Sequence, residues 1–145
     1  STPKPSSAAS DVYKRQGGTL AKLLTDVPGA SRYFTYGWVT YSNAAKISEL
    51  GISSELIEKY GAVSEQVAEA LARLARKRAN SDFAIGITGI AGPTGGDEQK
   101  PIGLVYISVD WNKGCEIKRF VFSGDRESIR LRAAQTALNM LRLKL

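Results

Sequence analysis

The sequence predicts an α/β fold: a single-domain α/β/α layer sandwich with a mixed sheet. Segments with apolar residues at helical spacing alternate along the chain with short apolar or β-branched runs. The last two of these runs, residues 103–110 and 115–123, are separated only by the turn sequence WNKG, which predicts an antiparallel hairpin. The 145 residues are a common size for one domain. Ligands of such sheets bind at strand ends, where loops lead into helices.

The beginning of the chain differs in pattern from the rest. Residues 1–16, STPKPSSAASDVYKRQ, are rich in Ser, Pro and Ala without periodicity, which predicts an unpatterned extension that is disordered or foreign to the domain. No apolar core follows its charges, so a signal peptide is not expected. The globular domain is expected over residues 17–145. Leucines at helical spacing predict a helix over 17–29, and the aromatic and β-branched run RYFTYGWVTYS predicts a strand over 32–42.

The remaining elements follow in chain order. Helical spacing predicts four further helices, over residues 43–51, 53–61, 64–80 and 125–145. Ser64 is the expected N-cap of the strongest of these helices, and Asp125 of the last one. Between them the apolar sequence DFAIGIT predicts a buried strand over residues 82–88. Helices therefore alternate with strands until the final hairpin, as a layered α/β fold requires.

Composition excludes several classes of chemistry. The chain has no histidine, which removes His-based triads and the usual zinc and iron sites. Its one cysteine, Cys115, cannot form an intrachain disulfide, and this favours a reducing, cytoplasmic compartment. No apolar stretch approaches the roughly 20 residues of a membrane helix, so no membrane partner is expected. The net charge of +6 admits a nucleic-acid partner, but the basic residues are spread along the chain, which favours a solubilising surface.

The sequence GITGIAGPTGG, residues 86–96, places five glycines after the buried strand. It matches neither of two known phosphate-binding motifs, because no Gly-Lys-Ser/Thr follows Gly89 and no helix pattern follows Gly96. Two interpretations remain. The loop is a connector that needs several residues with positive φ, or its backbone N–H groups, with the Thr88 hydroxyl, hold an anion or an oxyanion.

Two cations are expected in the first turns of helices, where the helix dipole disfavours positive charge. Lys46 follows the end of a predicted strand, and a partly buried lysine there could act as a base. A solvated surface lysine is the alternative. Arg126 opens the last helix, where it suits a phosphate or a carboxylate. Ser64 also stands at a helix start, but capping explains that serine fully.

Eight segments, in order, resemble one family: the C-terminal domain of the competence/damage-inducible protein CinA, known as the nicotinamide-nucleotide amidase family. The resemblance covers about residues 17–141, nearly all of the predicted globular part. The segments are Gly17-Gly18, LTDVPGAS, GWVTYSNAAK, LGI, GAVSEQVAEA, TGIAGPTGG, KPIGLVYI and FSGDRESIRLRAAQTAL.

The resemblance implies a compact α/β fold and a hydrolase of pyridine-nucleotide salvage. Such an amidase converts the carboxamide of nicotinamide mononucleotide into nicotinic acid mononucleotide and ammonia, without metal or organic cofactor. A serine in an Ala-Glu-Ser-Cys-Thr-Gly-Gly segment attacks the amide, and a lysine in a Tyr-Ser-Asn-x-x-Lys segment assists as base. The matching catalytic residues here are Tyr41 and Lys46. The implied substrate-binding residues are Gly17, Gly18, Ser42, Asn43, Thr88, Gly89, Gly92, Gly95, Gly96 and Arg126.

This chain departs from the family pattern at the nucleophile. Lys14 stands where the family has its serine, and Ser42 could substitute only if the geometry allowed. We therefore expect an impaired amidase, truncated and with a foreign start; the alternative is a catalytically inactive nucleotide-binding module. Loss of the strand before the Gly17-Gly18 pair would expose a sheet edge, which leaves homo-oligomerisation open. A nucleic-acid-binding domain linked to competence is a weaker third hypothesis, against which the scattered charges argue.

Overall fold

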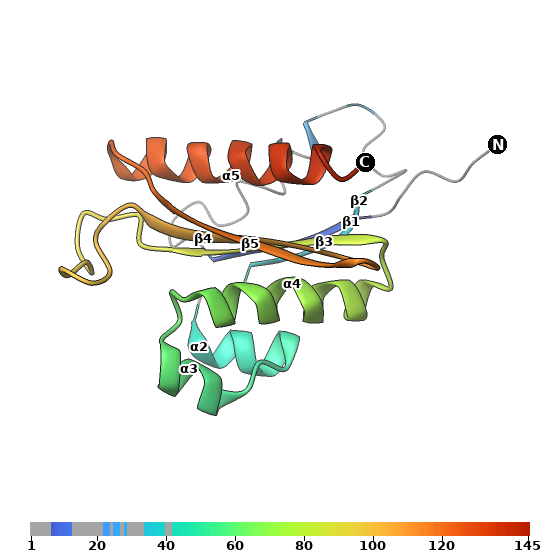
Figure 1. Cartoon of the computed structure of the whole chain (residues 1–145), viewed down its shortest axis with the longest axis horizontal. Helices are drawn as coiled ribbons and strands as arrows, with labels where there is room; N and C mark the ends of the chain where they lie inside the picture. Colours follow the sequence, from blue (N-terminus) through green and yellow to red (C-terminus); the bar gives the residue numbers. More distant parts are fainter. Residues whose placement is uncertain (1–6, 13–21, 24, 27, 29–33, 40–41) are drawn as a thin grey trace.

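A mixed five-stranded sheet forms the centre of the described molecule (Figure 1). The computed structural model describes residues 7–12, 22–23, 25–26, 28, 34–39 and 42–145. The strands are β1 (Ser7–Val12), β2 (Phe34–Val39), β3 (Phe83–Gly89), β4 (Leu104–Trp111) and β5 (Gly114–Val121), in the order β2-β1-β3-β4-β5. β1 is parallel to both of its neighbours, whereas β4 is antiparallel to both β3 and β5. The predicted mixed sheet and final hairpin are confirmed.

Helices cover both faces of this sheet (Figure 1). Helix α5 (Arg126–Arg142) lies on one face and α4 (Glu65–Ala79) on the other. The short elements α2 (Asn43–Ala45), η2 (Lys46–Leu50) and α3 (Ser54–Tyr60) pack on the outer side of α4. The predicted α/β/α layer sandwich is therefore confirmed, with a small further layer beside α4.

The two faces of β3 are packed differently. Ile85 and Ile87 point towards α5 and belong to the largest core cluster. On the opposite face, Ala84 and Gly86 meet α4, whose own buried residues at this contact include Ala68 and Ala72. Small side chains on both sides let the helix lie close to the strand, since backbone approach is limited by side-chain size. A separate cluster joins the outer side of α4 to the short helices: Leu50, Ile52, Ile57, Val67 and Leu71.

The predicted helix caps are confirmed. The Ser64 hydroxyl accepts a hydrogen bond from the backbone N–H of Val67 at 3.2 Å, which satisfies a free donor in the first turn of α4. Asp125 accepts in the same way from the N–H of Ser128 at 2.8 Å, and these hydrogen bonds from Ser128 lower the pKa of the Asp125 carboxyl. The starts of both long helices are thus fixed locally by sequence.

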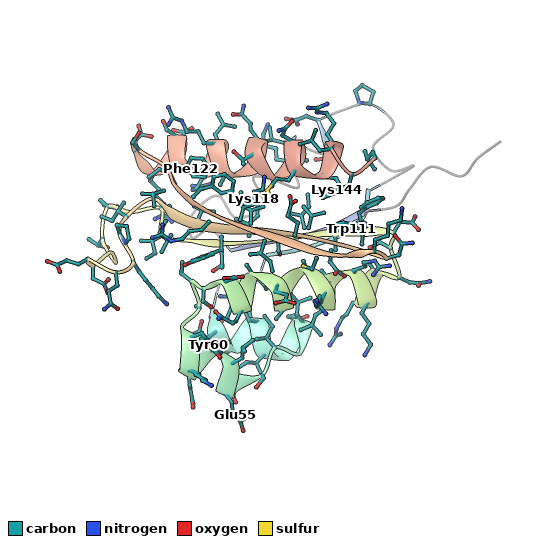
Figure 2. All side chains as sticks on the ribbon, viewed as in Figure 1. Glu55, Tyr60, Trp111, Lys118, Phe122 and Lys144 are labelled. Carbon is teal, nitrogen blue, oxygen red and sulfur yellow. The ribbon has the colours of Figure 1, made fainter. Side chains whose placement is uncertain are left out.

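The far end of α5 is fastened to the hairpin. The Lys144 ammonium lies 3.0 Å from a Glu116 carboxylate oxygen and 5.0 Å from the centroid of the Trp111 ring. Figure 2 shows Lys144 and Trp111 side by side at this end of the molecule. A cation over an indole and a partly buried ion pair both favour this docking.

The prediction that residues 1–16 contain no structural element is wrong for Ser7–Val12. This segment forms β1 and lies between β2 and β3, so the strand expected to be missing is present in the sheet. The reason is that an inner strand is held by main-chain hydrogen bonds to two neighbours, and this needs no apolar periodicity in its own sequence. The expected exposed edge at this place in the sheet is therefore also wrong.

The predicted helix over residues 43–51 is divided into two. One turn of α-helix is followed by the π-helical turn η2, in which the Lys46 carbonyl accepts from the N–H of both Gly51 and Ile52. Gly51 ends the element with φ +78°, a conformation that glycine adopts without steric cost. Such wider turns occur frequently at functional sites. Among the described residues, none of the helices has the length and apolar character that a membrane span requires.

Candidate functional site

A cavity of about 460 Å³ lies at the end of β3, within the range of about 300–1,000 Å³ that is usual for small-molecule sites. Four segments distant in sequence form its walls: the start of α2 and η2, the α3–α4 turn (residues 61–64), the glycine loop (the glycine-rich segment 86–96) and the start of α5. The lining residues are Ser42, Asn43, Lys46, Ala62, Val63, Thr88, Gly89, Ile90, Ala91, Gly92, Thr94, Gly95 and Arg126.

Lys46 is the buried cation of this cavity. Only 2% of its surface is exposed, which contradicts the alternative of a solvated surface lysine. Its backbone N–H donates to the Ser42 carbonyl at 3.1 Å, and the Ser42 hydroxyl accepts from the N–H of Ala45 at 3.1 Å. The capping bond thus occupies a lone pair of the Ser42 oxygen and fixes the turn that directs Lys46 inward. Asn43, next to this cap, also lines the cavity.

The glycine loop has the left-handed residues that the connector interpretation requires, and it also lines the cavity. Gly92 and Gly95 have φ values of +86° and +100°, as a connector with left-handed residues requires. The same loop lines the cavity from Gly89 to Gly92 and again at Thr94 and Gly95. Gly96 is not among the lining residues. A Cβ there would lie 2.6 Å from the backbone nitrogen of Ile102, so this glycine permits close packing within the loop.

Thr88 connects two walls of the cavity. Its side chain is 1% exposed, and Oγ1 donates a hydrogen bond to the Ala62 carbonyl at 2.8 Å. Because the hydroxyl proton is used in this bond, Thr88 can only accept a hydrogen bond from a ligand, so the expectation that this hydroxyl helps to hold an anion is wrong. Its main effect is to hold the α3–α4 turn against the end of β3.

Arg126 braces the glycine loop from the start of α5. One terminal nitrogen, Nη1, donates to the Gly92 carbonyl at 2.6 Å. The Nε–H group is buried and has no hydrogen-bond partner among the described residues. A buried unsatisfied donor is costly, so the arrangement favours an acceptor supplied by a bound ligand. A guanidinium with free donors beside a cavity suits a phosphate or a carboxylate.

The structure brings most of the predicted site residues together. Lys46 and Arg126 share one cavity with Ser42, Asn43, Thr88, Gly89, Gly92 and Gly95. Four named positions lie outside the described residues: Lys14, Gly17, Gly18 and Tyr41. Sequence reasoning missed two lining residues, Ala62 and Val63, whereas Ile90, Ala91 and Thr94 lie in the glycine-rich segment that it expected at the site without naming them individually. Ala62 and Val63 carry no reactive group, and the one sequence feature that could have placed them at the site is their position just before the Ser64 helix cap.

These features define a mixed α/β domain with a cavity at the end of β3, the kind of position at which such folds bind ligands. The family model for the CinA C-terminal domain matches residues 15–145. The chain therefore belongs to the CinA family, and the resemblance predicted from eight sequence segments is confirmed.

Individual relatives agree with this assignment. A CinA-like protein from Geotalea daltonii is 50% identical over 129 residues, which are 89% of this chain and 31% of the relative. The chain thus spans about a third of the length of the curated relatives it matches. A crystal structure of competence/damage inducible protein CihA from Agrobacterium tumefaciens superposes with a TM-score of 0.91 at 36% identity, over 96% of this chain and 84% of that one. The crystal structure of a CinA superfamily protein from Escherichia coli superposes with a TM-score of 0.90 at 32% identity, over 97% of this chain and 81% of that one.

Proposed function

We propose that the cavity is the substrate site of a nicotinamide-nucleotide amidase, which hydrolyses the carboxamide of nicotinamide mononucleotide to nicotinic acid mononucleotide and ammonia. One observation carries the proposal: a buried lysine and an arginine with a free, buried N–H line the same cavity, whose other lining residues are uncharged. The CinA family, which the sequence resembles on the Tyr-Ser-Asn-x-x-Lys segment, supports the choice of substrate.

Each group has a role in this chemistry. A nucleophilic oxygen adds to the amide carbon, and Lys46 takes its proton and then returns a proton to the departing ammonia. Backbone N–H groups of the glycine loop stabilise the tetrahedral oxyanion. Arg126 binds the nucleotide phosphate through its Nε–H group. Water then cleaves the acyl-enzyme ester and releases nicotinic acid mononucleotide.

The nucleophile decides how active this chain is. Lys14 occupies the place of the family serine, and the Ser42 oxygen caps α2. We therefore propose that amide hydrolysis is strongly impaired here, whereas nucleotide binding is retained. The second candidate function is a nucleotide-binding module without catalysis, and it is favoured by Lys14 in place of the family serine.

The test is ammonia release from nicotinamide mononucleotide, measured beside nucleotide binding by calorimetry. The chain is compared with a restored variant that carries five substitutions: Val12→Ala, Tyr13→Glu, Lys14→Ser, Arg15→Cys and Gln16→Thr. We expect the chain to bind the nucleotide with little turnover and the restored variant to release ammonia. A restored variant with Lys46→Met serves as the inactive control.

Three outcomes separate the possibilities. Turnover by the unaltered chain would show that its nucleophile lies elsewhere and would refute the role of position 14. Binding without turnover in both proteins would favour the nucleotide-binding module. Absence of both binding and turnover in both proteins would refute the proposed ligand.

A further inference from the structure

Two walls of the cavity come from segments that do not follow one another in the chain. The α3–α4 turn supplies Ala62 and Val63, and the outer part of the glycine loop supplies Gly92, Thr94 and Gly95. Figure 1 shows the loop between β3 and β4 projecting at the same end of the molecule as this turn. The shape of the cavity therefore depends on what holds the turn and the loop at a fixed separation.

Lys100 bridges these two segments. It belongs to the β3–β4 loop, and its Nζ donates a hydrogen bond to the Tyr60 carbonyl at 2.7 Å. Tyr60 is the last residue of α3, visible in Figure 2 on the α4 side of the sheet. The carbonyls of a final helical turn lack partners within the helix and carry its negative partial charge, so an ammonium group is a favourable donor there.

The local structure on both sides prepares this bond. The Asp97 carboxylate accepts from the backbone N–H groups of Gln99 and Lys100 at 2.9 and 2.7 Å, and the Asp97 N–H donates to the Lys100 carbonyl at 2.9 Å. These bonds close a tight turn that presents Lys100. On the other side, a Cβ at Gly61 would lie 2.7 Å from Nζ, so the absence of a side chain there permits the close approach.

The Lys100 bond complements the one that Thr88 makes. Thr88 holds Ala62 against the end of β3, whereas Lys100 holds the residue before Gly61 against the far part of the loop. The turn is thus fixed at two points, the Tyr60 carbonyl just before the wall and the Ala62 carbonyl within it. Lys100 itself is not among the residues that line the cavity.

We infer that Lys100 is a positioning residue that clasps the α3–α4 turn to the β3–β4 loop, which carries the glycine-rich wall, and thereby sets the affinity of the cavity for its ligand. The inference rests on the proposed function for the identity of that ligand. The clasp itself is a property of the unliganded protein and can be measured without any ligand.

The first measurement is amide hydrogen exchange of the unliganded chain. Lys100→Met removes the donor and keeps the length of the side chain. We expect exchange in residues 61–64 and 94–96 to become about tenfold faster, the effect of losing one charge-assisted hydrogen bond. Strands β4 and β5 are the internal reference for global stability. Lys113→Met, in the exposed turn at the opposite end of β4, removes the same charge and is the matched control.

The second measurement is the dissociation constant for nicotinamide mononucleotide by calorimetry. We expect Lys100→Met to weaken binding about tenfold, Lys113→Met to leave it unchanged, and Lys100→Arg to retain most of the affinity because it keeps a cationic donor. Exchange in Lys100→Met that matches the Lys113→Met control would overturn the clasp. Faster exchange with unchanged affinity would overturn the positioning role. If the unaltered chain binds no nucleotide, the proposed ligand fails, and the exchange data alone decide on the clasp.

Discussion

Gly86 lies directly against the backbone of α4, and Gly86→Ala tests how rigid that contact is. An added Cβ would lie 2.6 Å from the Ala68 carbonyl oxygen, 2.7 Å from Ser108 Oγ and 2.8 Å from the Ala72 nitrogen. Favourable contacts between heavy atoms begin near 3.5 Å. Two of the three neighbours are backbone atoms of α4, which cannot rotate away, so the whole helix has to move.

The expected cost follows from these contacts. Overpacking of a closed core typically costs about 1–3 kcal/mol. Ser108 Oγ also donates to the Ala68 carbonyl, and moving α4 weakens this bond, which contributes about 0.5–1.5 kcal/mol. We expect Gly86→Ala to lower the free energy of unfolding by about 2–4 kcal/mol, out of the roughly 5–15 kcal/mol typical of a domain. At about 2–4 °C for each kcal/mol, Tm would fall by roughly 5–15 °C.

Urea unfolding followed by circular dichroism measures this loss. Gly51→Ala is the contrasting variant, because Gly51 has φ +78° and an added Cβ would meet no atom within 4 Å, so its cost of about 1–2 kcal/mol reports left-handed strain without the overpacking expected at Gly86. Combining Gly86→Ala with Ser108→Ala should recover only a small part of the loss, since the backbone contacts remain. A loss below about 0.5 kcal/mol for Gly86→Ala, the range of neutral surface substitutions, would refute the tight contact.

Three further predictions concern the site and the cysteine. In the restored variant, Lys46→Met should lower ammonia release about 10²–10⁴-fold, the usual contribution of a general base, while nucleotide binding measured by calorimetry persists. Arg126→Met should weaken binding of nicotinamide mononucleotide more than that of the riboside without phosphate, because the free Nε–H group is proposed to bind the phosphate; equal losses would contradict that role. Burial, with a smaller contribution from Asp110, raises the pKa of the Cys115 thiol from 9.0 to about 11. Its reaction with a disulfide reagent should therefore be slow at pH 8 and accelerate until about pH 11, and the stability that the neutral thiol contributes is present below pH 9 and lost as the pH rises towards 11.

Local patterns in the sequence are sufficient to predict most of the helices and strands. Ser64 and Asp125 cap their helices as predicted, because a cap needs only a side chain and an N–H group three residues later. The hairpin of β4 and β5 was predicted equally well from two apolar runs and a short turn. Caps and hairpins depend on residues that are close in sequence, so the sequence itself contains the patterns that predict them.

β1 shows where this reasoning fails. Its sequence, SAASDV, has no apolar alternation, and its place between β2 and β3 is stabilised by partners 27 and more residues away. The η2 turn was missed for a similar reason, since a helix pattern does not reveal that a carbonyl accepts from five and six residues ahead. Long-range pairing and small changes in helical winding leave no local signature in a single sequence.

The sequence by itself determined which groups are available for chemistry: no histidine, one cysteine, a lysine and an arginine at helix starts, and a loop rich in glycine. It also carried the family resemblance that the comparisons confirm. Only the tertiary structure decided that Lys46 is buried, that Thr88 uses its proton within the protein, and that Lys100 reaches Tyr60. The physical reason is that burial and hydrogen-bond partnership depend on the distance between segments in space, which the order of residues does not fix.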